Sequence, residues 1–144
     1  MTYAIFYWSR FGHNKKIVED LSNKLEKKGV KTQIFKTDEI EPTKIPEAEI
    51  YIFSAPAEAF NVQRNMRTFM KKLEGVDGKK YAIINTHCMK NKNWLHKMEK
   101  ILSKKKNMNK VAQIDFHISG EGQKTGDGLT QGWEKKLDEF INKI

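Results

Sequence analysis

Residues 5–14, which read IFYWSRFGHN, give the strongest indication of the fold. The apolar run 5–8 is typical of a buried strand, and a short polar turn with a single glycine, Gly12, follows it. Residues 15–28 then place apolar side chains at helical spacing, which predicts a helix. A strand that leads through a tight turn into a helix N-terminus forms an anion site, because the first helical N–H groups have no partner within the helix.

The polar residues of this turn suit a phosphate ligand. Ser9 and Asn14 can add side-chain hydrogen bonds, and Gly12 permits close approach of the backbone because it has no Cβ. The simpler interpretation is that many strand–helix turns have such a composition. The turn alone therefore indicates a phosphate site without proving one.

Length and composition restrict the class of protein. The chain has 144 residues, so we expect a single domain spanning 1–144. Its one cysteine, Cys88, excludes an internal disulfide and favours a reducing compartment. No apolar stretch approaches the roughly 20 residues that span a bilayer, and the N-terminus lacks the layout of a signal peptide. We expect a soluble, cytoplasmic protein.

The charge is strongly basic, with 27 Lys and Arg against 18 Asp and Glu, or +9. Such a balance favours partners with acidic surfaces. No nucleic-acid-binding motif accompanies it, so no specific nucleic-acid partner is expected. The alternative is a solvated lysine-rich surface, to which the run 104–106 would belong.

Strand-like and helix-like segments alternate along the whole chain. This order predicts an α/β fold with a parallel sheet and helices on both faces, and ligands bind such sheets beyond the carboxyl ends of the strands. The strand at 31–36 alternates polar and apolar residues and is expected near an edge. The predicted strands are 2–8, 31–36, 50–53, 80–85 and 111–119, and the predicted helices are 15–28, 62–73, 93–104 and 133–144.

The loops at this edge resemble, in the same order, those of the flavodoxin-like family. Residues 9–14, SRFGHN, are similar to the family's phosphate loop, S/T-x-T-G-x-T/N. Residues 54–60, SAPAEAF, lie where its second loop flanks the flavin, and 65–70, NMRTFM, resemble its M-x-x-F-L helix. Residues 86–90, THCMK, occupy the third, flavin-facing loop.

The resemblance implies a three-layer, doubly wound sheet of five parallel strands in the order 2-1-3-4-5, bound FMN, and electron transfer. Phe11 replaces a hydroxyl residue of the family pattern, and Arg10 or Lys15 can offset the lost phosphate contact. Phe60 is the expected wall of the flavin ring. The implied cofactor-binding residues are Ser9, Arg10, Phe11, Gly12, His13, Asn14, Ser54, Ala55, Pro56, Ala57, Glu58, Ala59, Phe60, Thr86, His87, Cys88 and Met89.

The third loop also predicts a redox property. His87, Lys90 and Lys92 lie on it, and residues 86–92 include no acid. Positive charge stabilises an anionic reduced flavin, so we expect a less negative second reduction potential than in an acidic flavodoxin.

These features leave several functions open. The first is an FMN protein that carries electrons between protein redox partners. The second is a flavin-dependent oxidoreductase for a quinone or a protoporphyrinogen, as in some relatives, and the third is a flavodoxin-like domain that has lost FMN. We predict no catalytic residue. We also predict no metal site, because His13, His96, His117 and Cys88 lack metal-ligand spacing.

Overall fold

A parallel sheet forms the middle layer of the protein. The computed structural model describes residues 1–58, 61–88, 94–118 and 128–144, with residue 58 described by its backbone only. The parallel strands follow the order β2-β1-β3-β5-β6, and the short β4 pairs antiparallel with β3. Without β4 this is the predicted order 2-1-3-4-5, which is confirmed. The strands are β1 (Thr2–Tyr7), β2 (Lys31–Lys36), β3 (Ile50–Glu58), β4 (Asn61–Val62), β5 (Lys80–His87) and β6 (Asn109–His117).

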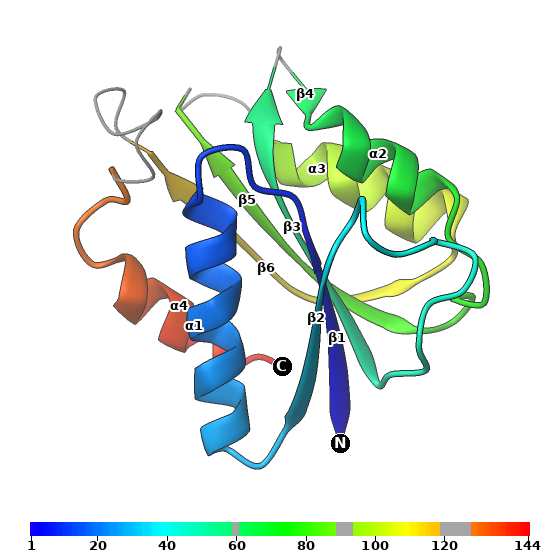
Figure 1. Ribbon diagram of the computed structural model, residues 1–144, viewed down its shortest axis with the longest axis horizontal. Helices are drawn as coiled ribbons and strands as arrows, with labels where there is room; N and C mark the ends of the chain where they lie inside the picture. Colours follow the sequence, from blue (N-terminus) through cyan, green and yellow to red (C-terminus); the bar gives the residue numbers. More distant parts are fainter. Residues whose placement is uncertain (59–60, 89–93, 119–127) are drawn as a thin grey trace.

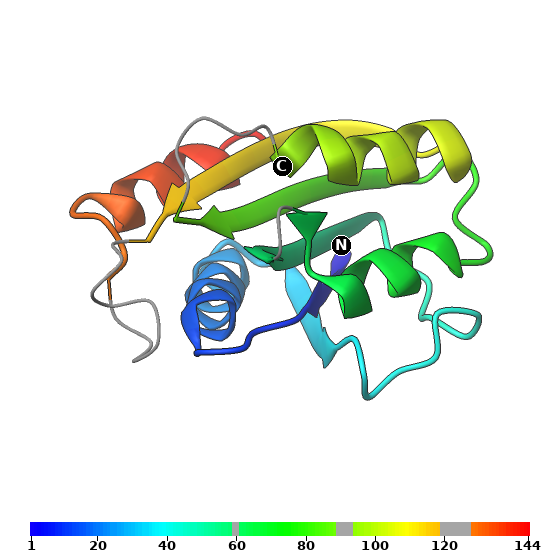
Figure 2. The same cartoon turned by 90° about the horizontal axis from the view of Figure 1, so that it is seen from above.

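Helices cover both faces of the sheet (Figures 1 and 2). α1 (His13–Lys27) and α4 (Trp133–Ile141) pack on one face. α2 (Arg64–Lys71) and α3 (Trp94–Glu99) pack on the other, where α3 continues as the π-helix η1 (Lys100–Lys105). The three layers predicted from the alternation of elements are therefore present.

The alternation of side chains along each strand fills two cores. In β1, Ile5 packs into the core beneath α1 and α4, whereas its neighbour Phe6 packs into the core beneath α2 and α3. Both side chains are completely buried. Interior strands are apolar on both faces because helices cover both, and this explains the continuous apolar runs in the sequence. β2 lies at the edge as predicted, and its Ile34 is exposed.

Several element boundaries differ from the prediction. β3 extends to Glu58 because β5 pairs with it as far as Pro56 and β4 pairs with its last two residues. Much of the predicted second loop is therefore strand. α2 begins at Arg64 and not at residue 62, because Asn61–Val62 forms β4. In β6 a register shift opposite Tyr81 leaves one extra residue, and the strand begins earlier, at Asn109.

The topology brings the functional segments to one edge. β1, β3 and β5 run parallel, so their carboxyl ends meet at the same side of the sheet. Helices α1 and α2 also begin at this side, as Figure 1 shows. The candidate site lies at this edge.

Candidate functional site

A hollow at the carboxyl edge of the sheet joins the three predicted segments. It holds about 380 Å³, including space open to solvent. All but one of the residues that line it are among those predicted from the sequence, and the exception, Ile118, follows β6. The lining residues are Ser9, Arg10, Phe11, His13, Asn14, Pro56, Ala57, Thr86, His87, Cys88 and Ile118.

The N-terminus of α1 has no capping side chain. Gly12 is the N-cap residue in the left-handed region, with φ of 98°, and its carbonyl accepts the first helical hydrogen bond, from the Lys16 N–H at 3.0 Å. The Gly12 N–H donates to Ser9 Oγ at 3.1 Å, and the first turn contains no acid. The helix therefore offers its positive end to an anion. A Cβ at Gly12 would meet no atom within 4 Å, so the positive φ, and not crowding, accounts for the glycine.

Asn14 braces the hollow from below. Its side chain is 1% exposed. Ser54 Oγ donates to Asn14 Oδ1 at 2.8 Å, and Asn14 Nδ2 donates to Thr86 Oγ1 at 2.9 Å. The sequence predicted that this amide binds phosphate, which stays a prediction; the structure shows that both of its polar atoms bond other parts of the protein and that the residue lines the hollow. Asn14 thus ties α1 to the ends of β3 and β5.

The second segment divides into a fully buried part and a half-buried part. Ser54 and Ala55 are fully buried, and the Ala55 carbonyl accepts a hydrogen bond from Asn85 Nδ2 at 2.9 Å. Pro56 and Ala57 reach the hollow and give it an apolar wall. The predicted contacts of Ala59, Phe60 and Met89, and of the side chain of Glu58, fall outside the described residues, as do Lys90 and Lys92.

The third segment contributes two side chains with different chemistry. His87 is 6% exposed, and its Nε2 lies 2.6 Å from Asp115 Oδ2. Cys88 is half-buried, and burial raises the pKa of its thiol. A raised pKa leaves less thiolate at neutral pH, so this cysteine is not an activated nucleophile.

Besides Ile118, sequence reasoning also missed Asp115 and Lys136, which lie beside His87 and Asp115 respectively. Lys136 Nζ, from α4, lies 3.8 Å from Asp115 Oδ1 and also donates to the Asp115 carbonyl. Asp115 lies in a strand whose apolar residues alternate with polar ones. The sequence could therefore predict on which face of the sheet its side chain lies. It could not predict the partner on β5, because that pairing depends on the register between the two strands.

Two further observations concern the part of the chain that the structure describes. Within it, no group of three or more His, Cys, Asp and Glu side chains has an arrangement that could hold a metal ion. No helix among the described residues combines the length and apolar character needed to cross a membrane.

Comparison with solved structures identifies the fold. An archaeal flavodoxin superposes with a TM-score of 0.71 at 19% identity, over 99% of this chain and 98% of that one. A Streptococcus pneumoniae flavodoxin gives 0.75 at 14% identity, over 99% and 97%. The rubredoxin oxygen:oxidoreductase of Desulfovibrio gigas gives 0.79 at 12% identity, and this chain spans 35% of its length.

The protein therefore has a flavodoxin-like fold, and the resemblance predicted from the loops is confirmed at that level. It shares the arrangement of whole flavodoxins and of about a third of one larger oxidoreductase. No family model and no curated protein sequence matches the chain.

Proposed function

We propose that this chain binds FMN in the hollow and carries electrons between protein redox partners. The observation that supports this most is the uncapped N-terminus of α1 beside a hollow with apolar walls. FMN has the matching halves, an anionic phosphate and a flat ring. When bound it supplies the redox chemistry, and the protein sets its position and potential. The cytoplasmic location expected from the sequence stays a prediction.

The residues present fit each half of the cofactor. At the phosphate end lie the N–H groups of the first turn of α1, the Ser9 hydroxyl and the exposed Arg10. Ser9 Oγ accepts a hydrogen bond from Gly12, so its own proton remains a donor for an anion. Phe11, with Pro56 and Ala57, supplies apolar surface for the ring.

A charge placed at the N-cap of α1 tests this proposal. In Gly12→Asp a carboxylate stands beside the expected phosphate, and at about 5 Å each pair of unit charges repels by roughly 3 kcal/mol at an effective dielectric of 20, before salt screening. We expect FMN affinity to fall at least about tenfold, whereas riboflavin, which lacks the phosphate, changes little. Quenching of flavin fluorescence on titration measures both.

Gly132→Asp is the matched control. Gly132 is the N-cap of α4, also left-handed with φ of 88° and also without a capping side chain. The two variants thus carry the same charge change and comparable backbone strain. Equal FMN affinity in the two variants would remove the phosphate assignment. Failure of the unaltered protein to bind FMN would instead favour a flavodoxin-like domain that has lost its cofactor.

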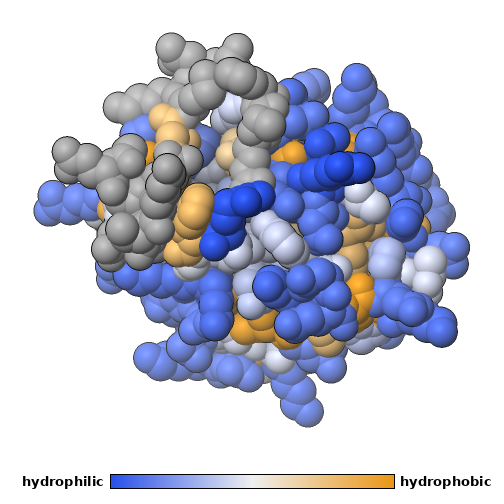
Figure 3. All heavy atoms as spheres, turned by 45° about the horizontal axis from the view of Figure 1, so that its top comes forward, coloured by the Kyte–Doolittle hydropathy of each residue, from blue (hydrophilic) through white to orange (hydrophobic). Residues whose placement is uncertain are grey.

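The partner is proposed to have an acidic docking surface. Arg10, Lys15, Lys16 and Arg64 are exposed around this edge, and the first turns of α1 and α2 contain no acid. Figure 3, in which the carboxyl edge of the sheet comes forward, shows a largely hydrophilic surface. Among the described residues the exposed large hydrophobic side chains are Met1 and Ile34. Among the described residues, charge is therefore the feature available for docking.

Small oxidants of opposite charge test this surface. Ferricyanide, an anion, should oxidise the reduced protein faster at low than at high ionic strength, and hexaamminecobalt(III), a cation, should show the opposite trend. Lys15→Glu should slow the ferricyanide reaction several-fold, whereas Lys104→Glu, in η1, should change it less than twofold. Equal rates for the two variants would contradict the proposed surface.

A further inference from the structure

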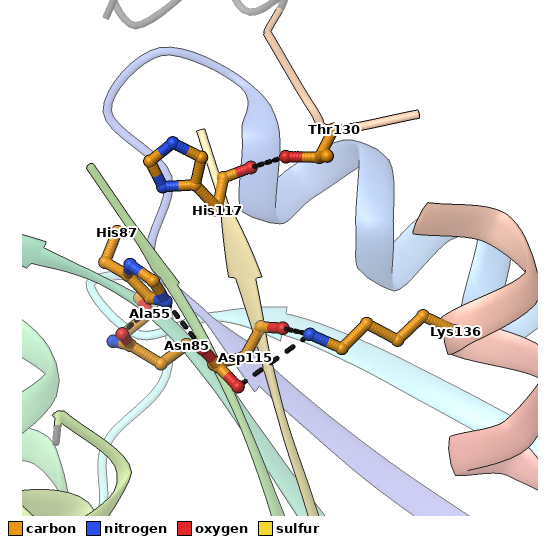
Figure 4. Close-up of polar contacts among 7 residues, drawn as sticks. All are labelled: Ala55, Asn85, His87, Asp115, His117, Thr130 and Lys136. Carbon is orange, nitrogen blue, oxygen red and sulfur yellow. Dashed lines mark hydrogen bonds and ion pairs between the residues drawn. The ribbon is translucent and has the colours of Figure 1, made fainter. Parts of the chain in front are cut away.

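A histidine and a carboxylate meet at the rim of the hollow. β5 and β6 pair in parallel, with Asn85 opposite Asp115 and His87 opposite His117. Alternate residues of a strand share a face, so these four side chains lie on the same face of the sheet. His87 Nε2 reaches diagonally to Asp115 Oδ2 at 2.6 Å, as Figure 4 shows.

The contact assigns the proton on the imidazole. A carboxylate only accepts hydrogen bonds, so Nε2 of the neutral His87 carries the hydrogen. Nδ1 is then the basic atom of the ring. It is buried and has no hydrogen-bond partner among the residues that the structure describes. An unpartnered acceptor thus lies in a side chain that lines the hollow.

Asp115 connects this histidine to solvent. Its side chain is 48% exposed, in contrast to the buried imidazole. Lys136 holds it from α4 through both the carboxylate and the main-chain carbonyl (Figure 4). The carboxylate is therefore anchored and cannot easily turn away from the ring.

The groups that face His87 differ in their effect on its gain of a proton. The Asp115 carboxylate favours it, and neighbouring cationic groups oppose it. Asp115 is the acid in contact with His87, and the Cys88 thiol, whose pKa is raised by burial, is neutral at pH 7. The neighbouring β3 side chains that the structure describes, those of Pro56 and Ala57, are uncharged, and the side chain of Glu58 falls outside the described residues. The remaining titratable or cationic neighbours described are His117 of β6, with its ring 5.8 Å away, His13 of α1 and Lys136 of α4.

We propose that His87 couples electron uptake at the hollow to uptake of one proton. This rests on the proposed function. When a reductant delivers the second electron to bound FMN, one proton from solvent binds His87 Nδ1, so that one positive charge accompanies the added negative one. No bond other than the new N–H forms, and Asp115 acts as a positioning residue that stabilises the imidazolium.

The pH dependence of the second reduction potential tests the coupling. One proton per electron corresponds to 59 mV for each tenfold change in proton concentration. We expect the potential of the unaltered protein to fall with rising pH at close to this slope, and His87→Gln to flatten it. His96→Gln, which removes an exposed histidine of α3, is the control and should keep the slope.

If the His87→Gln variant does not fold, Asp115→Asn provides a second test of the coupling. Without the carboxylate the imidazolium is less stable, so the sloping region should move to lower pH. Nitrogen NMR of the flavin-free protein gives a separate readout, and the neutral ring of His87 should carry its hydrogen on Nε2.

A hydrogen on Nδ1, or equal slopes with and without His87, would overturn the inference. A protein that never binds FMN would overturn the proposed function with it, whereas FMN binding with equal slopes would overturn this inference alone.

Discussion

Two helices, α1 and α2, begin at the same edge of the sheet, but only one of their N-termini is capped by a side chain. At α2, Gln63 Oε1 accepts a hydrogen bond from the Met66 N–H at 2.9 Å, and the Gln63 N–H donates to the Pro56 carbonyl at 2.9 Å. At α1 the N-cap is Gly12, which has no side chain. The chain thus closes one helix terminus with its own side chain and leaves the other without a side-chain cap.

This difference bears on which of the two N-termini is able to accept an anion. Both termini carry the same partial positive charge and both lack acids in the first turn. Only the N-terminus of α1 combines an absent cap with neighbours that form a hollow. The residue at the N-cap and the position of the helix therefore both matter, because Gly132 at the N-cap of α4 also lacks a capping side chain but does not line the hollow.

The largest effect is expected from removing the brace beneath the open terminus. Asn14→Ala leaves the buried Ser54 hydroxyl and the Thr86 hydroxyl without their partner, and each unmet buried group costs about 1–3 kcal/mol. We expect the free energy of unfolding to fall by roughly 3 kcal/mol, measured by urea denaturation. Asn23→Ala, on the exposed side of the same helix, is the control and should change it by less than about 0.5 kcal/mol. Similar losses in both variants would mean that Asn14 is not a brace.

A smaller effect is expected from opening the closed terminus. Gln63→Ala removes the side-chain acceptor for Met66 and should lower the free energy of unfolding by about 1 kcal/mol. Gln63→Asp keeps an acceptor at this position and should recover much of the loss. FMN affinity should stay within twofold in both variants, because Gln63 does not line the hollow described here. A marked fall in FMN affinity would show that the two termini are not independent.

The sequence predicted the architecture well because the signals were local. Apolar runs such as 50–53 and 81–84 reveal strands covered on both faces, and the single glycine of 9–14 reveals the turn into α1. These patterns depend on neighbours along the chain. The order of the strands followed from the resemblance of the loops, and the structure agrees with it.

The roles of individual side chains were predicted less well, because they depend on distant partners. Asn14 was expected to bind phosphate, and the sequence did not show that its amide also bonds Ser54 and Thr86, which are 40 and 72 residues away. Asp115 was missed because its contact with His87 depends on the register of β5 and β6. The π-helix η1 was predicted as ordinary helix because its apolar residues have normal helical spacing.

The Asn14 brace has a consequence for the way the chain folds. Contacts between residues far apart in sequence close large loops and form late. The hydrogen bond from Asn14 to Thr86 requires β1, α1, β3 and β5 to be in place. The hollow therefore forms only when most of the sheet has assembled. Nascent chains that end before residue 86 contain helix α1 without its anchored N-terminus, and they should capture no cofactor during synthesis.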